Sequence, residues 1–237
     1  MDIMEIITDS LLYPFENLKA LMTYVILGFI LGIVIAITGV GTISGIDKSS
    51  YITLIIALIG LFISILISFL INGYGLDIIK LGITRSNASP EIDLQRQVIN
   101  GVKSFILSIV YYIVPIIIML VLSLIFKKWI LYIVGFILLV LFSLAATMGQ
   151  CRLAKTEDLS YSLNISSAID DIFNIGLIKV LLTIIIIMIV LIVITVIFNF
   201  IFNMIFNQII ASAILGIIEV YLTFFSNRAM GLLYSEI

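Results

Sequence analysis

The sequence contains no histidine, and Cys151 is its only cysteine. Histidine is the commonest metal ligand and general base in proteins, so its absence removes the simplest metal-binding and catalytic arrangements. A single cysteine excludes a disulfide bond within the chain and leaves the redox compartment undetermined. The metalloprotease, serine–histidine and nucleotide-binding motifs are also missing. We therefore expect a protein that is not an enzyme, without a catalytic residue, metal site or bound cofactor.

Charged residues are equally scarce. They make up 11% of the 237 residues, whereas hydrophobic residues make up 63%. A soluble domain is usually about one quarter charged and about half apolar, so this chain has too little charge to cover a soluble surface. Its 12 basic and 14 acidic residues give a net charge of −2. Because no basic tract is present, nucleic acid is not expected as a partner, and a lipid bilayer is.

The apolar residues are grouped into six long runs. About 20 consecutive apolar residues span the hydrocarbon core of a bilayer as a helix. The runs contain consecutive Ile, Leu and Val rather than alternating residues, which favours helices over barrel strands. The predicted spans are residues 21–43, 52–72, 105–126, 129–148, 177–198 and 209–225, the last continuing as helix to about 233. We predict an all-α polytopic membrane bundle whose six transmembrane helices form three hairpins in a single transmembrane domain, 1–237.

Basic residues near the ends of the spans are divided unequally between the two sides. The side shared by both termini has Lys19, Lys80, Arg85, Arg96, Lys103, Arg152, Lys155, Lys179 and Arg228, and the other has Lys48, Lys127 and Lys128. Because basic residues concentrate in cytoplasmic loops, we predict a multi-pass protein of the cell membrane with cytoplasmic termini. The glycine-rich residues 39–48 are predicted to form the turn between the first two spans.

Short amphipathic segments precede the three pairs of spans, at residues 2–18, 91–102 and 167–176. Ser89 and Pro90 are suited to the N-cap and first turn of the second segment. We expect these segments to be helices at the cytoplasmic surface, where their acidic faces offer a surface to a protein partner. The pattern also suggests a threefold repeat of roughly 1–85, 86–160 and 161–237, although ordinary inner loops would look similar.

Small and polar residues recur every four positions in the first two spans. They are Gly28, Gly32 and Ala36 in the first span, and Gly60, Ser64, Ser68 and Asn72 in the second. This spacing places each set on one face of its helix. Lipid provides little hydrophobic drive between helices, so small residues that permit close backbone contact are important. We interpret both faces as packing within the hairpin; self-association and a polar path are the alternatives.

Glu219 is the one acidic residue inside a predicted span. It lies about ten residues from the start of that span, or roughly 15 Å deep at about 1.5 Å per residue. A charge near the middle of a bilayer costs about 2.5–3.5 kcal/mol or more, so the side chain should face the bundle interior. The candidate partners at similar depth are Tyr111, Tyr112, Ser64 and Ser68. The two interpretations are an ion or proton site and a structural hydrogen bond between helices.

Two further features also have two interpretations. Pro115, which follows the two tyrosines, favours a kink that shapes either a pocket or ordinary packing. Asn199, Asn203 and Asn207 are spaced by four at the outer end of the fifth span. We interpret these asparagines as an outer interfacial turn, and an amide-lined mouth for a solute is the alternative.

Several segments carry a family resemblance. They are YPFENLKAL before the first span, NGYGLDIIKLGITR after the second, INGVKSFILSIVYYIVPIII into the third, GQCRLAKTEDLSYSLNISSAIDDIF in the long loop, and the closing FFSNRAMGLLYSE. Together they resemble the uncharacterised, largely archaeal membrane-protein family called domain of unknown function 4013. The resemblance covers nearly the whole chain and implies a polytopic membrane protein, but no activity and no site residue.

Three classes of function remain. A non-catalytic scaffold or accessory subunit needs no chemistry and is the plainest interpretation. A transporter or channel for a small solute or ion would use Glu219 and the polar face of the second span. An intramembrane or lipid-handling enzyme is the third class, and the missing catalytic pairs argue against it. The sequence does not determine a substrate or an oligomeric state.

Overall fold

The computed structural model describes residues 1–48 and 51–237, with their side chains except those of residues 40–48, 52, 53 and 128. Within these residues the chain forms nine helices and no strand. The helices are α1 (Ile3–Glu16), α2 (Leu18–Lys48), α3 (Tyr51–Ile83), α4 (Leu94–Ser123), α5 (Lys128–Thr156), α6 (Leu159–Ser162), α7 (Ile165–Ile175), α8 (Leu177–Ile205) and α9 (Gln208–Tyr234).

Six of these helices (α2, α3, α4, α5, α8 and α9) are long and apolar enough to cross a membrane. This confirms the all-α polytopic fold predicted from the sequence. α3 contains 33 residues, which corresponds to about 50 Å at about 1.5 Å per residue. The hydrocarbon core is only about 30 Å thick. The helix is therefore long enough to extend beyond the core by several turns, and its last turns carry Asp77 and Lys80.

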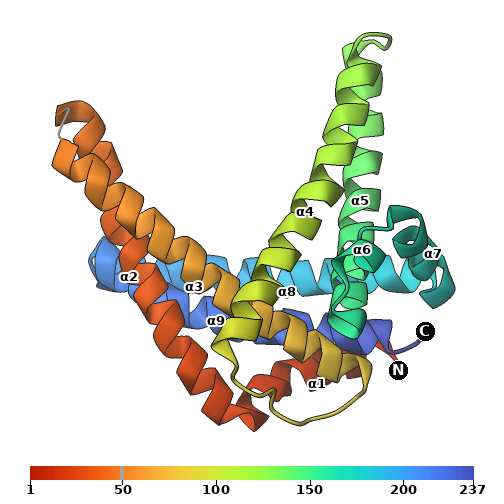
Figure 1. Ribbon diagram of the computed structural model, residues 1–237, viewed down its shortest axis with the longest axis horizontal. Coiled ribbons are helices and arrows are strands. Elements are labelled where there is room, and N and C mark those ends of the chain that lie inside the picture. Colours follow the sequence, from red (N-terminus) through yellow and green to blue (C-terminus); the bar gives the residue numbers. More distant parts are fainter. Residues whose placement is uncertain (49–50) are drawn as a thin grey trace.

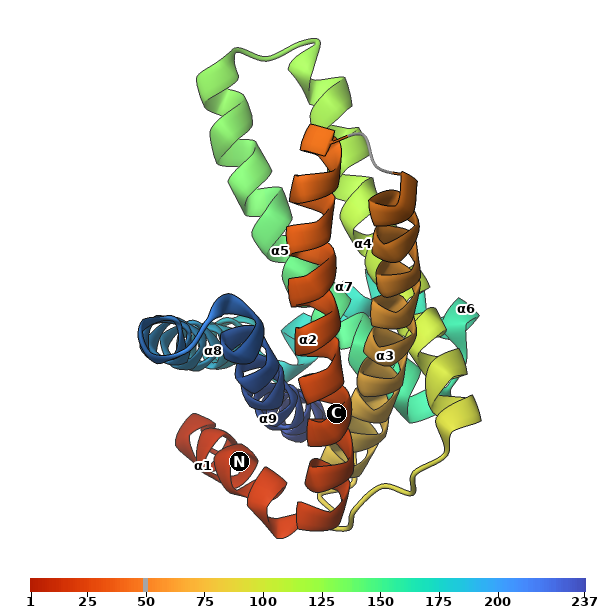
Figure 2. The same cartoon turned by 90° about the vertical axis from the view of Figure 1, so that its left-hand side faces the viewer.

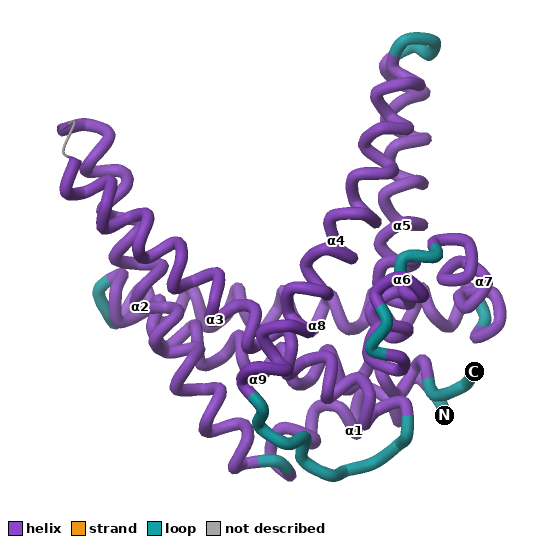
Figure 3. The backbone as a smooth tube through the Cα atoms, viewed as in Figure 1, coloured by secondary structure: helices purple, strands orange, loops and turns teal. Residues whose placement is uncertain are grey.

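The helix pairs α2–α3 and α4–α5 diverge from one another toward their connecting turns (Figures 1 and 3). At the other end the two pairs meet, and the two chain termini lie close together there (Figure 1). Figure 2 views α8 nearly end-on, so its axis runs across the direction of α2 and α3, and α8 packs against α9. The last helix, α9, packs against α1, α2, α3 and α8 and occupies the centre of the bundle.

Two of the three amphipathic segments are separate helices. α1 begins after Asp2, which forms a capping box with Glu5, and α7 begins after Asn164, whose side chain accepts a hydrogen bond from the Ser167 backbone. The second segment is not separate, and its predicted start at Ser89-Pro90 is wrong. The side chain of Asp93 caps the helix instead, and the amphipathic turns continue directly into the span α4, through Gly101.

Two predicted turns are helical. α2 continues through the glycine-rich residues to Lys48, so the turn predicted at residues 39–48 is wrong. Residues 49–50, which connect α2 to α3, lie outside the described residues. The interfacial turn expected near Asn199 is also wrong, because α8 continues to Ile205. The Asn203 amide donates hydrogen bonds to the carbonyl and side-chain oxygens of Asn199. Paired along one helix face, the amides are satisfied without breaking the helix. Asn207 caps α9.

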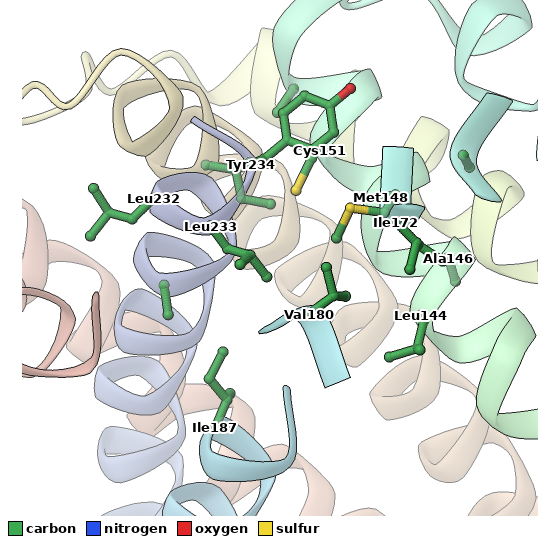
Figure 4. Close-up of a cluster of buried hydrophobic side chains, with 14 of the residues drawn as sticks. Leu144, Ala146, Met148, Cys151, Ile172, Val180, Ile187, Leu232, Leu233 and Tyr234 are labelled. Atoms are coloured by element: carbon green, nitrogen blue, oxygen red, sulfur yellow. The ribbon is translucent and has the colours of Figure 1, made fainter. Parts of the chain in front are cut away.

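Two hydrophobic clusters form the core where the helices meet. The larger joins α1, α3, α4, α5, α7, α8 and α9, and Figure 4 shows Met148, Val180 and Leu233 within it. The smaller contains the stacked rings of Tyr24 and Tyr74, whose centroids are 4.2 Å apart. Burial is therefore concentrated at the end of the bundle where the two chain termini lie.

The kink that Pro115 favours does not end the helix, because α4 continues through Pro115 without interruption.

The small residues of α2 contact α9 rather than the hairpin partner α3. A Cβ atom on Gly32 would collide with the Ser212 backbone, and one on Gly28 would collide with the α9 backbone as well. Gly60 of α3, in contrast, lies against α2, and Ala36 is buried. These residues bring helices into close contact, but the two glycines of α2 contact a helix far away in the sequence.

Candidate functional site

Glu219 lines a cleft of about 360 Å³ between α2, α3 and α9. The other polar residues in the lining are Ser68, Asn72, Ser212 and Thr223, and the remainder are glycine and aliphatic residues. The Glu219 carboxylate accepts a hydrogen bond from the Thr195 hydroxyl of α8 at 3.2 Å. The cleft therefore combines one carboxyl group with a largely apolar wall.

The sequence-predicted partners of Glu219 are distributed over three places. Ser68 lines the same cleft, and Ser64 lines a neighbouring cleft of about 310 Å³ between α3 and α4. Tyr111 is buried and donates a hydrogen bond to the Ser162 carbonyl at 2.9 Å. Tyr112 lines an apolar cleft between α4 and α5. Of the four candidates, only Ser68 shares a cleft with the carboxyl group.

Polar side chains continue from the Glu219 cleft toward α5. The two clefts share Ser68 and Asn72, and the second is also lined by Ser104 and Ser108 of α4. The Ser104 hydroxyl donates to the Gln150 side chain at 2.9 Å, and the Gln150 amide donates to the Ser108 hydroxyl at 3.3 Å. Hydrogen bonds thus join the polar side chains of α4 and α5, and those of α3 line the same cleft as the serines of α4.

The first of three ion pairs joins α3 to the start of α4. The Arg96 guanidinium donates to both oxygens of Asp77, at 2.6 and 3.0 Å. The Gln97 amide donates to the same carboxylate at 3.3 Å, and the Tyr24 hydroxyl donates to Gln97. A bidentate contact of this kind fixes the orientation of the two side chains as well as their distance. It therefore connects the end of α3 to the start of α4.

The second ion pair joins α5 to α7. Arg152 donates to Asp171 at 2.9 Å, and both side chains are nearly buried. The Tyr234 hydroxyl of α9 donates to the same carboxylate oxygen at 2.9 Å. The guanidinium also lies 4.0 Å from the ring centroid of Tyr161, a stacking geometry that favours arginine.

The third ion pair joins α9 back to α1. The Arg228 side chain is 1% exposed and donates to Asp9 at 2.8 Å. It also donates to the Ser86 carbonyl and the Asn87 side chain, both at 2.6 Å. Its guanidinium lies 4.7 Å from the ring of Tyr13. Burial raises the pKa of Tyr13 to about 12, although the Arg228 charge opposes this.

These three pairs follow one rule. Each connects the end of one span pair to an amphipathic segment: the first two pairs reach the segment that follows in the chain, and the third returns to α1. Lys80 of α3 adds a pair with Glu157 at 2.7 Å. Many basic residues that indicate orientation in the sequence are therefore also used in contacts within the chain.

The chain ends are held by Glu236. Its carboxylate accepts hydrogen bonds from Lys179 at 2.6 Å and from the Met1 ammonium at 2.9 Å. Burial opposes ionisation of this carboxyl, but the hydrogen bonds from these two cations outweigh it and lower the pKa of Glu236 below 4.5. Folding therefore favours the ionised form of the Glu236 carboxyl.

This pairing predicts a pH-dependent contribution to stability. A carboxyl with a lower pKa in the fold contributes stability above its unfolded-state pKa and loses that contribution as the pH falls through its folded-state pKa. We expect wild type to be more stable than Glu236→Gln near neutral pH, and the difference to shrink as the pH falls below 4.5. Unfolding of both proteins in detergent across the acid range measures this, and a difference independent of pH would contradict it.

Comparisons with known proteins give one result. Neither the curated proteins nor the solved structures contain a match to the chain. In the described part of the chain, no three His, Cys, Asp or Glu side chains gather as a metal site would require. A family model matches residues 56–203, more than half of the chain, from α3 to α8. The matched region includes the first two ion pairs but not Glu219. The chain therefore belongs to DUF4013, a family of proteins of unknown function.

Proposed function

We propose that this membrane protein is a non-catalytic scaffold or accessory subunit that holds a protein partner within the bilayer. The observation that carries the proposal is the unequal packing of its spans. At one end, buried and partly buried charge pairs tie the span pairs together. At the other end, α2–α3 and α4–α5 diverge (Figure 1). The spans are therefore held together at the end with the ion pairs, and they expose helix surfaces to a partner at the diverging end.

The acidic residues of the amphipathic helices are less suited to a partner than the sequence suggests. Asp9 of α1 and Asp171 of α7 are used in pairs within the chain, and Glu5 serves in the helix cap. The spans instead present large apolar side chains, with Phe62 64% exposed and Tyr132 75% exposed. The proposed contact therefore lies on the spans rather than at the cytoplasmic face.

Photocrosslinking in native membranes tests the scaffold proposal. Benzoylphenylalanine replaces Tyr132 or Phe136, which are exposed on α5, and Met148, which is fully buried on the same helix. We expect both exposed positions to form an adduct with the same protein and the buried position to form none. Adducts with lipid alone at both exposed positions would contradict a protein partner. Adducts of equal yield at all three positions would show that the reaction is unspecific.

We infer that the end bearing the termini faces the cytoplasm of the cell. The basic residues near that end, including Arg85 and Lys155, outnumber those near the diverging turns, and basic residues favour the cytoplasmic side. Single cysteines at Ala88 and Ser160, both exposed, test the inference on a Cys151→Ser background. We expect an impermeant maleimide to label them only after the cells are opened. Labelling of either position in intact cells would reverse the orientation.

A second candidate is a transporter of a small solute or ion, and the cleft beside Glu219 is the observation that favours it. An ionisable residue inside a span is often part of a solute or ion path. Flux of protons or cations into liposomes, compared between wild type and Glu219→Gln, tests this candidate. A flux that the substitution abolishes supports it, and equal flux or no flux in the two proteins rejects it.

A further inference from the structure

The Glu219 cleft contains a single charged residue. Its lining otherwise consists of neutral residues, and among the described residues the carboxylate has one side-chain contact, with the Thr195 hydroxyl. In the described part of the chain, none of the ion pairs includes Glu219. An anion in an apolar setting is costly unless a cation accompanies it. A ligand with a positive charge would supply the counter-charge that the chain does not.

The rest of the lining argues against a bare metal ion as that ligand. Hard cations such as Ca²⁺ take about six to eight oxygen ligands, whereas this wall exposes mainly hydrocarbon, including Leu31, Ile71 and Leu215. The Asn72 amide donates to the Ser68 carbonyl within its own helix. The Thr223 hydroxyl likewise donates to the Glu219 carbonyl. The polar groups are thus partly used within their own helices, and the wall suits a cation that carries its own hydrocarbon.

The size and position of the cleft agree with such a ligand. Its volume of about 360 Å³ lies within the range of small-molecule sites, about 300–1,000 Å³. The Glu219 side chain is exposed, and it lies within the candidate span Gln208–Tyr234. A molecule dissolved in the bilayer therefore reaches the carboxylate from the side, without first crossing water-filled space.

We propose that the Glu219 cleft binds the ammonium group of an amphiphilic organic amine that enters from the lipid. The carboxylate pairs with the ammonium group, and the aliphatic wall contacts the first part of the hydrocarbon chain. The inference uses the cleft that motivates the transporter candidate, but it requires binding only and not flux.

Equilibrium binding of tritiated dodecylammonium tests the proposal in phosphatidylcholine nanodiscs at neutral pH. We expect one saturable site per chain, with unlabelled dodecylammonium competing and dodecanol, which has the same tail without the charge, failing to compete. Glu219→Gln should weaken binding by about tenfold or more, since a charge-assisted contact is lost. Glu91→Gln removes a charge from the loop before α4 and should leave binding unchanged.

A second variant separates shape from charge. Ser68→Leu fills the cleft while keeping the carboxylate, so it should also weaken binding. Unchanged affinity in both Glu219→Gln and Ser68→Leu, or equal competition by dodecanol, would overturn the proposal. Saturable binding that depends on Glu219, together with no flux in liposomes, would support the site and reject transport. Size-exclusion elution of each variant shows whether it is folded. If one of the two variants aggregates, the affinity of the other one decides the test.

Discussion

Arg228→Met is expected to lower the free energy of unfolding by about 3 kcal/mol, because the buried guanidinium loses its partly buried ion pair with Asp9 and its hydrogen bonds to Ser86 and Asn87. The guanidinium is 1% exposed and donates to α1 and to two residues of the loop between α3 and α4. Its loss leaves Asp9 and the Ser86 carbonyl without these donors. Methionine keeps much of the side-chain volume, so the effect reports the lost polar contacts rather than a cavity.

Two control variants test whether the loss of stability comes from the contacts of Arg228. Arg85→Met removes an exposed arginine whose side chain donates to Ser235, and an exposed contact of this kind is worth at most about 1 kcal/mol. Adding Asp9→Leu to Arg228→Met should recover part of the loss, because no unpaired carboxylate remains. Unfolding by sodium dodecyl sulfate in mixed micelles measures all of these proteins. Equal destabilisation by the Arg228 and Arg85 substitutions would contradict the role of the third ion pair.

Gly32→Ala is expected to destabilise the bundle by about 1–3 kcal/mol, the usual cost of overpacking. The added Cβ atom would meet the carbonyl of Ser212, and a backbone atom cannot turn aside as the end of a side chain can. α2 and α9 would have to separate. Because α9 is the central helix, this separation would also disturb the cleft beside Glu219.

Gly39→Ala is the matched control for this prediction. It lies in the same helix, and a Cβ atom there would meet no atom of the described residues within 4 Å. Alanine has a higher helix propensity than glycine by about 1 kcal/mol. The control should therefore be neutral or stabilising, so the two substitutions are expected to have opposite signs in the same detergent titration. Loss of stability at both positions would indicate a general effect of glycine substitution rather than contact between α2 and α9.

The six spans were predictable because hydropathy is a local property of the sequence. Five of the six predicted runs lie within one of the long helices, and the third run, residues 105–126, passes the end of α4 at Ser123 by three residues. The boundaries were less predictable, since Asn203 satisfies its amide within α8 and Asp93 rather than Ser89 caps α4. The group that a polar side chain bonds to depends on the local backbone, and residue type alone does not determine it.

The site was only partly predictable, for a different reason. Glu219 could be identified because an acidic residue inside an apolar span is unusual. Its partner Thr195 was missed, although the signal was a hydroxyl in the aliphatic run of α8. The periodicity of one helix shows which residues share a face, but not which other helix that face meets. For the same reason, the contact of Gly28 with α9 could not be deduced from its spacing.

On the proposed function, the chain works by holding a protein partner within the membrane. The most direct test is the mass of the protein extracted from native membranes in lipid nanodiscs without detergent. The scaffold account predicts a complex of the chain with one other protein at fixed stoichiometry, which the photocrosslinks at Tyr132 and Phe136 also identify. Isolation of the chain alone, combined with a flux that depends on Glu219, would contradict that account and support the transporter.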